Sequence, residues 1–446
     1  MKREIELSIS ADYVPNWDVW CAIRELVQNA ADAHEQGFPM SIEYNPDSKE
    51  PTLIISNKGA VFNKDTLLLG RTTKMGTNQR GIFGEGYKLA WLTLLRLGYE
   101  VWLRTRNERW TPRIEHSDTF GADVLKVEIF PLEKVEDGVK MEIRGIQAAD
   151  WELAKKRLIL PYFNPIKPAD VIAVGGNNIL TAFEYSGQLF VKGIWVASLG
   201  TKYKFGYNFT DLSLDRDRKL ANPWELKLRI AQSISRAVAS KALSAEKVYQ
   251  LLEEDCCEEC RAIEDLADTQ ICESLSKDIV TQFYAAHGSS KNVIAVKSIQ
   301  ESSQAAHFGL KGVIVSRGIA SLFAQVEGDT QTRFVSLETT EKVRFGYHDL
   351  SAEERSCIDW VISILLLLDV DKPVKVVEFN GKSVMGKWHN NEICLSRAIL
   401  TNRAELVATA VHEAAHIPGY SDGEPLHQRE MESLFGRLVA GWMKDV

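Results

Sequence analysis

Glu25-Leu26-Val27-Gln28-Asn29-Ala30-Ala31-Asp32-Ala33 is the stretch that decides the fold of the N-terminal part of this chain. Its polar residues Glu25, Asn29 and Asp32 stand at positions i, i+4 and i+7, which share one face of a helix. Residues 17–35 also carry apolar side chains at helical spacing. The stretch therefore predicts a helix that presents a carboxylate and an amide on one side.

Two glycine-containing turns follow this helix along the chain. Residues 52–56 predict a short strand that ends at Asn57, where Gly59 permits a sharp turn. Gly86 opens an apolar helix that is expected to reach residue 97, and backbone N–H groups at such a helix start bind phosphates. The other candidate residues around the phosphates are Thr73, Lys74, Gly81, Gly84 and Lys88.

The residue types suit magnesium-dependent hydrolysis of a nucleotide. Asn29 can give Mg²⁺ a neutral oxygen ligand while the phosphates supply others. Glu25, one turn earlier, can orient and deprotonate the attacking water. Asp32 suits a structural anchor for the surrounding loops, and Asn57 can hydrogen-bond the edge of adenine. We therefore expect ATP and Mg²⁺ as cofactors, with Glu25 as the catalytic base.

These motifs resemble a known family. Glu25-x3-Asn29-x2-Asp32-Ala33 is similar to the N-box of the GHKL ATPases, which include gyrase, the large heat-shock chaperone, histidine kinases and mismatch-repair MutL. Thr73-Lys74 with the glycines at 81, 84 and 86 is similar to the lid and phosphate box of MutL- and MORC-type members. The resemblance covers residues 1–150 and implies the Bergerat fold, an α/β sandwich, with Glu25 as general base.

The resemblance leaves two questions open. The adenine-binding box of the family carries Asp-x-Gly-x-Gly, whereas this chain has Asn57-Lys58-Gly59-Ala60-Val61, so nucleobase selectivity is undecided. In the hydrolase branches a second domain delivers a lysine or arginine to the γ-phosphate. The candidates here are Lys202, Lys204, Arg216, Arg218 and Lys219, and we favour the turn at residues 215–218.

A second motif, His412-Glu413-Ala414-Ala415-His416, predicts a zinc site near the other end of the chain. Residues 404–417 have a helical pattern, so both imidazoles point the same way and can bind one Zn²⁺. Glu413 is placed to take a proton from a zinc-bound water, whose pKa falls toward about 7. Pro418-Gly419 ends the helix, and the turn can bring Asp422 back as third ligand. Competing third ligands are His427, Glu430 and Glu432.

This second motif also resembles a known family. The pattern His412-Glu413-x2-His416-x2-Gly419-x2-Asp422 is similar to that of the metzincins, in the form with Asp at the last position. A third ligand at Glu430 or Glu432 would instead resemble the gluzincin arrangement. The strand expected at residues 392–395 is placed like the substrate-aligning edge strand of zincins. The resemblance implies a zinc-dependent metallopeptidase domain.

Length and composition bound the remaining expectations. With 446 residues the chain is too long for one core, and we expect an α+β multidomain protein. A net charge of −8 does not support a nucleic-acid partner. No apolar run approaches the about 20 residues of a membrane span, and seven irregularly spaced cysteines fit a reducing cytoplasm. The expected domains are an ATP-binding domain at 1–150, a transducer-like α/β unit with a long helix at 151–254, a helical connector with a small α/β unit at 255–345, and a zincin-like domain at 346–446. Within the second of these, residues 189–196 predict a strand and residues 223–253 predict one long helix.

Together the two motifs predict an ATP-hydrolysing protein in which nucleotide binding gates a zinc metallopeptidase that acts on a protein substrate. The alternative is a MORC-like or chaperone-like clamp with a structural or inactive zinc domain, which would bind a client protein or nucleic acid and form a homodimer on binding ATP. Glu413 favours the peptidase, because a purely structural zinc site has no need of this glutamate.

Overall fold

The computed structural model describes residues 2–47, 49–68, 85–215 and 218–442. Within these ranges the chain is mixed α/β and contains several separate sheets. It divides into two compact units, one formed by Met1–Ser244 with Cys256–Leu266 and the other by Ala245–Asp255 with Ala267–Val446. None of the helices in the described ranges combines the length and apolar character that crossing a membrane requires.

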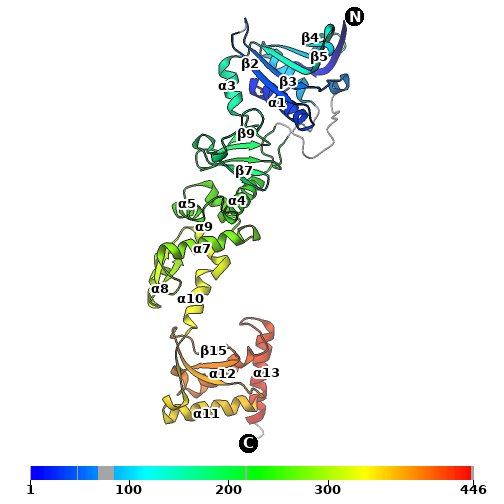
Figure 1. Ribbon diagram of the computed structural model, residues 1–446. Helices are drawn as coiled ribbons and strands as arrows, with labels where there is room; N and C mark the ends of the chain where they lie inside the picture. The colour runs from blue at the N-terminus through cyan, green and yellow to red at the C-terminus, as the bar shows by residue number, and fades with distance from the viewer. Residues whose placement is uncertain (1, 48, 69–84, 216–217, 443–446) are drawn as a thin grey trace. The chain divides into compact units, whose positions relative to one another are not determined.

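The N-terminal part of the first unit is a sheet on which two helices pack (Figure 1). Its strands are β1 (Arg3–Ser10), β2 (Met40–Asn45), β3 (Thr52–Lys58), β4 (Glu100–Ser117) and β5 (Ala122–Arg144). The long strand β5 pairs with β1 near its start, with β3 near its end, and with β4 over most of its length. Helices α1 (Val19–Glu35) and α2 (Gly86–Arg96) contact each other and share one apolar core with this sheet. Strand β3 therefore ends, at Asn57 and Lys58, beside α1.

A second sheet completes the first unit. Its strands are β6 (Val171–Val174), β7 (Asn177–Leu180), β8 (Gln188–Val191), β9 (Ile194–Ser198) and β10 (Gly206–Phe209), in the order β6-β7-β10-β8-β9. The sequence suggested one strand over residues 189–196, but the chain makes a hairpin there. Lys192 and Gly193 both have positive φ, at 50° and 81°, and reverse the chain between β8 and β9. Helix α3 (Ala148–Lys156) connects the two sheets in sequence.

The long helix expected after residue 223 is broken. Helix α4 (Pro223–Ala239) ends where Lys241 takes a φ of 62°, and the N–H groups of Ala242 and Leu243 both donate to the carbonyl of Ala237. Helix α5 (Ala245–Glu254) then starts in the second unit, while α6 (Glu258–Glu264) belongs to the first. The expectation of one continuous helix was therefore wrong, because a left-handed residue ends the first helix.

After α5, the second unit continues with α7 (Glu273–His287) and a pair of parallel strands, β11 (Val293–Val296) and β12 (Lys311–Ile314). Around them lie α8 (Ile299–His307), α9 (Arg317–Glu327) and α10 (Thr330–Glu338). A four-stranded sheet follows, in the order β13-β14-β16-β15. Its strands are β13 (Glu341–Phe345), β14 (Val374–Phe379), β15 (Gly386–His389) and β16 (Glu392–Ser396), and its helices are α11 (Ala352–Leu367), α12 (Arg403–Ala415) and α13 (Pro425–Trp442).

The strand order of this last sheet corrects one expectation. The strand expected at residues 392–395 is β16, which lies between β14 and β15 and is therefore internal. The edge strand is β15, which pairs antiparallel with β16 and contacts α12. A cluster of buried apolar side chains from α11, α12, α13 and the sheet forms the core beneath it.

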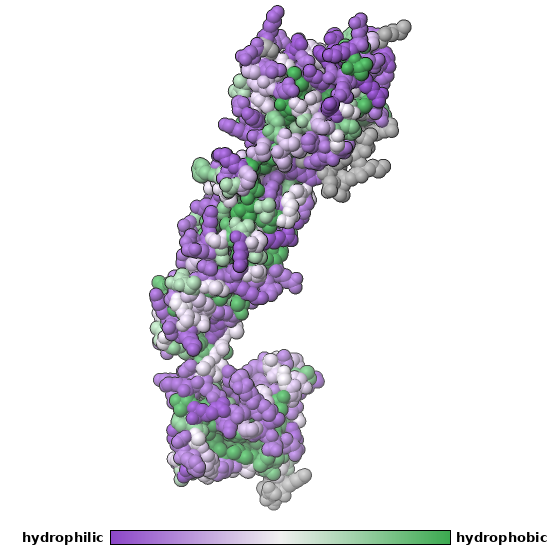
Figure 2. Space-filling view, viewed as in Figure 1, coloured by the Kyte–Doolittle hydropathy of each residue, from purple (hydrophilic) through white to green (hydrophobic). Residues whose placement is uncertain are grey.

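The core that carries α1 should respond to truncation as a packed interior does. Hydrophilic residues dominate the visible surface of both units (Figure 2), whereas Leu26 of α1 is only 1% exposed. We expect Leu26→Ala to lower the free energy of unfolding by about 2–5 kcal/mol. The matched control Leu153→Ala, at a side chain that is 49% exposed on α3, should stay within about 0.5 kcal/mol. Urea denaturation followed by tryptophan fluorescence measures both, and equal losses would contradict this placement of the core.

Candidate functional sites

The polar face of α1 meets the first turn of α2. The side chain of Asp18 caps α1 by accepting a hydrogen bond from the backbone N–H of Cys21. Glu25 is only 6% exposed, whereas Asn29 on the same face is partly exposed. A Cβ atom at Gly86 would lie 2.9 Å from Oε2 of Glu25 and 3.1 Å from Nδ2 of Asn29. Glycine therefore allows the N–H end of α2 to approach Asn29, as a phosphate site requires.

Two arginines contact the Glu25 carboxylate. Nη2 of Arg24 lies 3.1 Å from Oε1 of Glu25, and Nε of Arg218 lies 3.7 Å from the same oxygen. All three side chains are buried. Arg218 comes from the segment between the second sheet and α4 and has a left-handed backbone, with a φ of 64°. The turn favoured from the sequence thus places one of its cations at Glu25.

The other candidate cations divide between two places. Arg216 lies outside the described residues. Lys219 pairs by its backbone with Asp215, next to Arg218. The backbone of Lys202 accepts a hydrogen bond from the N–H of Glu258, and the N–H of Lys204 donates to the Glu259 carboxylate, so these two lysines lie on the segment that α6 covers.

The structure orients the side-chain amide of Asn57. Its Nδ2 atom donates to the carbonyl of Ala30 at 2.9 Å and to that of Phe38 at 2.8 Å. Both amide hydrogens are therefore used, and only the side-chain oxygen remains to accept a hydrogen bond from a ligand. Gly59, with a φ of 75°, follows directly and turns the chain away from β3. In this setting Asn57 offers an acceptor, as the aspartate of the resembled family does.

The remaining nucleotide candidates are placed in part. Thr73, Lys74, Gly81 and Gly84 lie outside the described residues. Lys88 is buried, and its Nζ donates to the carbonyls of Thr66 and Leu68 at 3.0 and 2.8 Å. Burial lowers the pKa of Lys88. Asp32 is buried on α1. The pKa of the Tyr87 hydroxyl is raised, mainly by the burial of Tyr87 itself and to a smaller extent by the nearby charge of Asp32.

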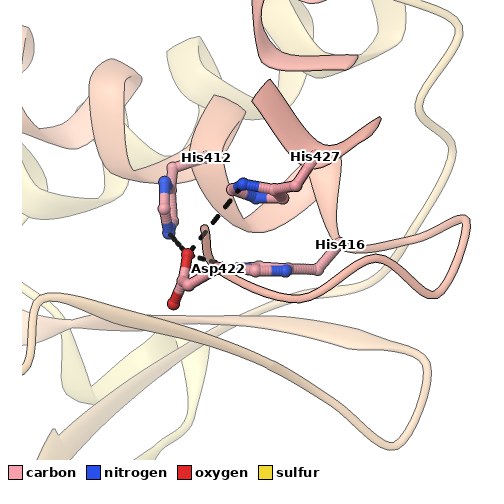
Figure 3. Close-up of side chains that lie close together, drawn as sticks. All are labelled: His412, His416, Asp422 and His427. Atoms are coloured by element: carbon pink, nitrogen blue, oxygen red, sulfur yellow. Dashed lines mark ion pairs between the residues drawn. The ribbon is translucent and has the colours of Figure 1, made fainter. Parts of the chain in front are cut away.

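Among the described residues, the metal candidates form a group of side chains close enough together to hold one ion. His412 and His416 lie one turn apart at the end of α12, and the helix ends at Ala415 with His416 as its C-cap. Gly419, with a φ of 95°, then reverses the chain. Asp422 returns to the two rings, with its Oδ1 atom 3.1 Å from Nε2 of His412 and 3.5 Å from Nε2 of His416 (Figure 3).

These distances fit a tetrahedral metal ion. Zinc bonds of about 2.0–2.2 Å in a tetrahedron place neighbouring donor atoms about 3.3–3.6 Å apart. The Nδ1 atom of His416 lies 2.8 Å from the carbonyl oxygen of Tyr420, which must accept, so this ring carries its proton there and directs its Nε2 lone pair at the cluster. Burial lowers the pKa of His412 and so favours the neutral imidazole that a metal binds.

His427 joins the cluster as a fourth group. It lies in the first turn of α13, and its Nδ1 atom is 4.0 Å from Oδ1 of Asp422. One ligand atom from each of the four side chains lies within 4.8 Å of all the others. The competing glutamates lie elsewhere, because Glu430 contacts Arg437 and Glu432 accepts from Gln428. Sequence spacing named His427 only as an alternative, since the loop before α13 decides its direction.

Glu413 lies between the metal candidates and the edge strand. It is buried on α12, and its Oε2 atom accepts a hydrogen bond of 2.7 Å from the backbone N–H of Trp388 in β15. Burial raises the pKa of Glu413. Gly386 permits this contact, since a Cβ there would lie 2.5 Å from Cγ2 of Thr409 and 2.9 Å from Cγ of Glu413. A hollow of about 480 Å³ opens beside these residues, and Glu413, His416, Asp422 and Trp388 line it.

Comparison with known proteins gives one distant relative and no family. No protein-family model matches the chain. A protein of Mycoplasma pneumoniae, described as uncharacterized, is 22% identical over 231 residues, which cover 49% of this chain and 90% of that protein. This similarity names no activity.

The orientation of Asn57 leads to a prediction about its replacement by the aspartate of the resembled family. Asn57→Asp places a carboxylate oxygen against the carbonyls of Ala30 and Phe38, which then lose their donor and face a negative charge. We expect a loss of about 1–3 kcal/mol in the free energy of unfolding. Asn57→Ala removes the two hydrogen bonds without the repulsion and should cost no more than the aspartate. Urea denaturation of both variants tests this, and a neutral Asn57→Asp would show that the amide is oriented otherwise.

Proposed function

We propose that the chain is an ATP-binding and ATP-hydrolysing protein that carries a zinc-dependent peptidase site. The observation that supports the peptidase most strongly is that Glu413 lines the same hollow as His416 and Asp422, next to an edge strand. A bound zinc ion would polarise a water molecule and lower its pKa. Glu413 is then the group that accepts the proton of that water, because its carboxylate lies beside the cluster and is held by the N–H of Trp388.

The edge strand supports a peptide as the substrate class. An extended chain can add to β15 on the side away from β16, through the main-chain groups other than the N–H of Trp388, which Glu413 already occupies. The scissile carbonyl would then lie along the hollow that Glu413 and His416 line. The side chain of Lys387 in this strand donates to the hydroxyl of Thr339, and both residues line the hollow.

The nucleotide half of the proposal rests on the meeting of α1, α2 and Arg218. In this proposal Asn29 binds Mg²⁺, and the N–H groups at the start of α2 bind the phosphates. The side-chain oxygen of Asn57 accepts a hydrogen bond from the adenine amino group. Arg218 is the group that the terminal phosphate would attract away from Glu25, because both anions compete for one guanidinium. Glu25 would then be available to a water molecule. We further propose that the movement of Arg218 from Glu25 to the terminal phosphate controls the activity of the peptidase site.

One observation favours the alternative, a clamp with a structural metal. Four converging protein groups are the number that closes a structural zinc site, whereas a catalytic site keeps one position for water. In that case the first unit would bind ATP and dimerise while the zinc only holds α12 and α13 together. Light scattering with and without a non-hydrolysable ATP analogue, together with a protein cleavage assay, separates the two functions.

The ATPase prediction concerns Glu25. Glu25→Ala should lower kcat for ATP hydrolysis by at least about 100-fold, the usual effect of losing a general base, and leave nucleotide binding within threefold. The control Glu35→Ala removes an exposed carboxylate from the last turn of the same helix and should keep most of the activity. The measurements are phosphate release and fluorescent-nucleotide binding. Retention of full activity in Glu25→Ala would remove Glu25 from the mechanism.

The peptidase prediction concerns Glu413. Glu413→Gln should lower cleavage of an unfolded protein substrate such as casein by about 100-fold or more and leave the zinc content unchanged, because the glutamate is not a ligand. Glu432→Gln, an exposed glutamate of α13, is the matched control and should retain activity. A chelator should abolish cleavage, and zinc should restore it. Absence of cleavage by the wild-type chain in every nucleotide state would leave the clamp as the better function.

A further inference from the structure

The metal cluster contains two kinds of ligand, which differ in how the fold holds them. His412, His416 and His427 come from helices that pack in the core of the second unit. Asp422 comes from the connection between those helices, and its side chain is 74% exposed. The spacing pattern alone favoured Asp422 as the third ligand. The packing indicates a different division of the four groups.

His427 is built into the site. Its side chain is 3% exposed and stacks on His416, with ring centroids 4.2 Å apart and an interplanar angle of 20°. Its Nε2 atom is buried with no hydrogen-bond partner, and its Nδ1 atom faces the cluster. Burial removes the hydration of this ring, a cost that an interaction with a bound ion offsets. Nδ1 is the nitrogen placed to bind a metal ion, and the stacking of the ring on His416 holds Nδ1 toward the cluster.

The carboxylate of Asp422 faces the three imidazoles. Within the part of the chain that the structure describes, its ion pairs are those with His412, His416 and His427. Gly419 and Gly423, with φ of 95° and 82°, stand on either side of it, so backbone turns that favour glycine frame the connection. Ordering the connection around Asp422 costs conformational entropy each time this carboxylate binds the metal ion, whereas the three histidines are already ordered by the packing of the helices. Asp422 should therefore contribute less net affinity than any of the three rings.

We propose that His412, His416 and His427 form the permanent ligand set and that Asp422 occupies the fourth position as a displaceable ligand. This inference rests on the proposed function, in which the cluster binds zinc. Three histidines and one exchangeable position make a catalytic type of site, and the Asp422 carboxylate closes it in the conformation seen in Figure 3. Movement of the connection at residues 418–424 would open that position beside Glu413.

The test compares zinc affinity in matched variants of the full chain, measured by competition with a chromogenic chelator. His427→Ala should weaken zinc binding by at least about 100-fold, as expected for loss of a ligand from the permanent set. Asp422→Ala should weaken it by less than about tenfold, because the three remaining ligands are the histidines that the packing already holds in place. His389→Ala, an exposed histidine at the end of β15, is the control and should leave the affinity unchanged. Circular dichroism of each apo variant checks that it is folded.

A second measurement reports the open position directly. Cobalt-loaded Asp422→Ala should bind a small anion such as azide at least about tenfold more tightly than cobalt-loaded wild type, because the anion no longer competes with a carboxylate. The visible absorption of cobalt follows this binding without any substrate. Near-equal azide binding by the two proteins would overturn the displaceable role of Asp422.

The outcomes separate this inference from the proposed function. If Asp422→Ala loses zinc as severely as His412→Ala while His427→Ala keeps it, the inference is wrong and the zinc site stands with Asp422 as a permanent ligand. If Asp422→Ala and His427→Ala lose zinc equally, all four ligands are permanent and the displaceable role is also wrong. If the wild-type chain binds no zinc, both the inference about Asp422 and the proposed peptidase are wrong.

Discussion

The end of α12 is the constraint on which the metal cluster depends. A helix that continued beyond His416 would carry residue 422 about 9 Å further along its axis, at 1.5 Å per residue. The helix ends instead, and Gly419 turns the chain back so that Asp422 reaches the rings. The same turn brings the carbonyl of Tyr420 to Nδ1 of His416. One chain reversal thus brings one candidate ligand to the cluster and orients another.

In the first unit, the candidate nucleotide site depends on the close approach of the backbone of α2 to side chains of α1. Gly86 allows the start of α2 to lie against Glu25 and Asn29, and a side chain there would separate the helix end from the amide. Asn57 is oriented from the opposite side, by the carbonyls of Ala30 and Phe38. Backbone groups therefore determine which atoms of the polar side chains can meet a ligand, and residue types alone do not reveal this.

The features that depend on residues close in sequence, such as helices and pairs of residues one helical turn apart, could be predicted from residue spacing. The sequence placed α1, α2 and α12 close to their observed bounds, and it paired His412 with His416 correctly because helical residues four apart share a face. It did not find β15, whose four residues are too short for a clear alternation and are defined by pairing with β16. The contact between Arg218 and Glu25 joins residues far apart in sequence, so the sequence could name a candidate turn but no partner.

His427 shows why the candidate metal site was only partly predictable. Its distance from His416 depends on the path of residues 417–424 and on the packing of α13 against α12, which are tertiary properties. Once that packing is known, burial distinguishes the ligands better than motif position does. A ring stacked inside the core cannot leave without disturbing two helices, whereas a carboxylate on an exposed connection can. Under the proposed function, this difference lets a four-ligand cluster remain compatible with a reaction that needs a water molecule on the metal.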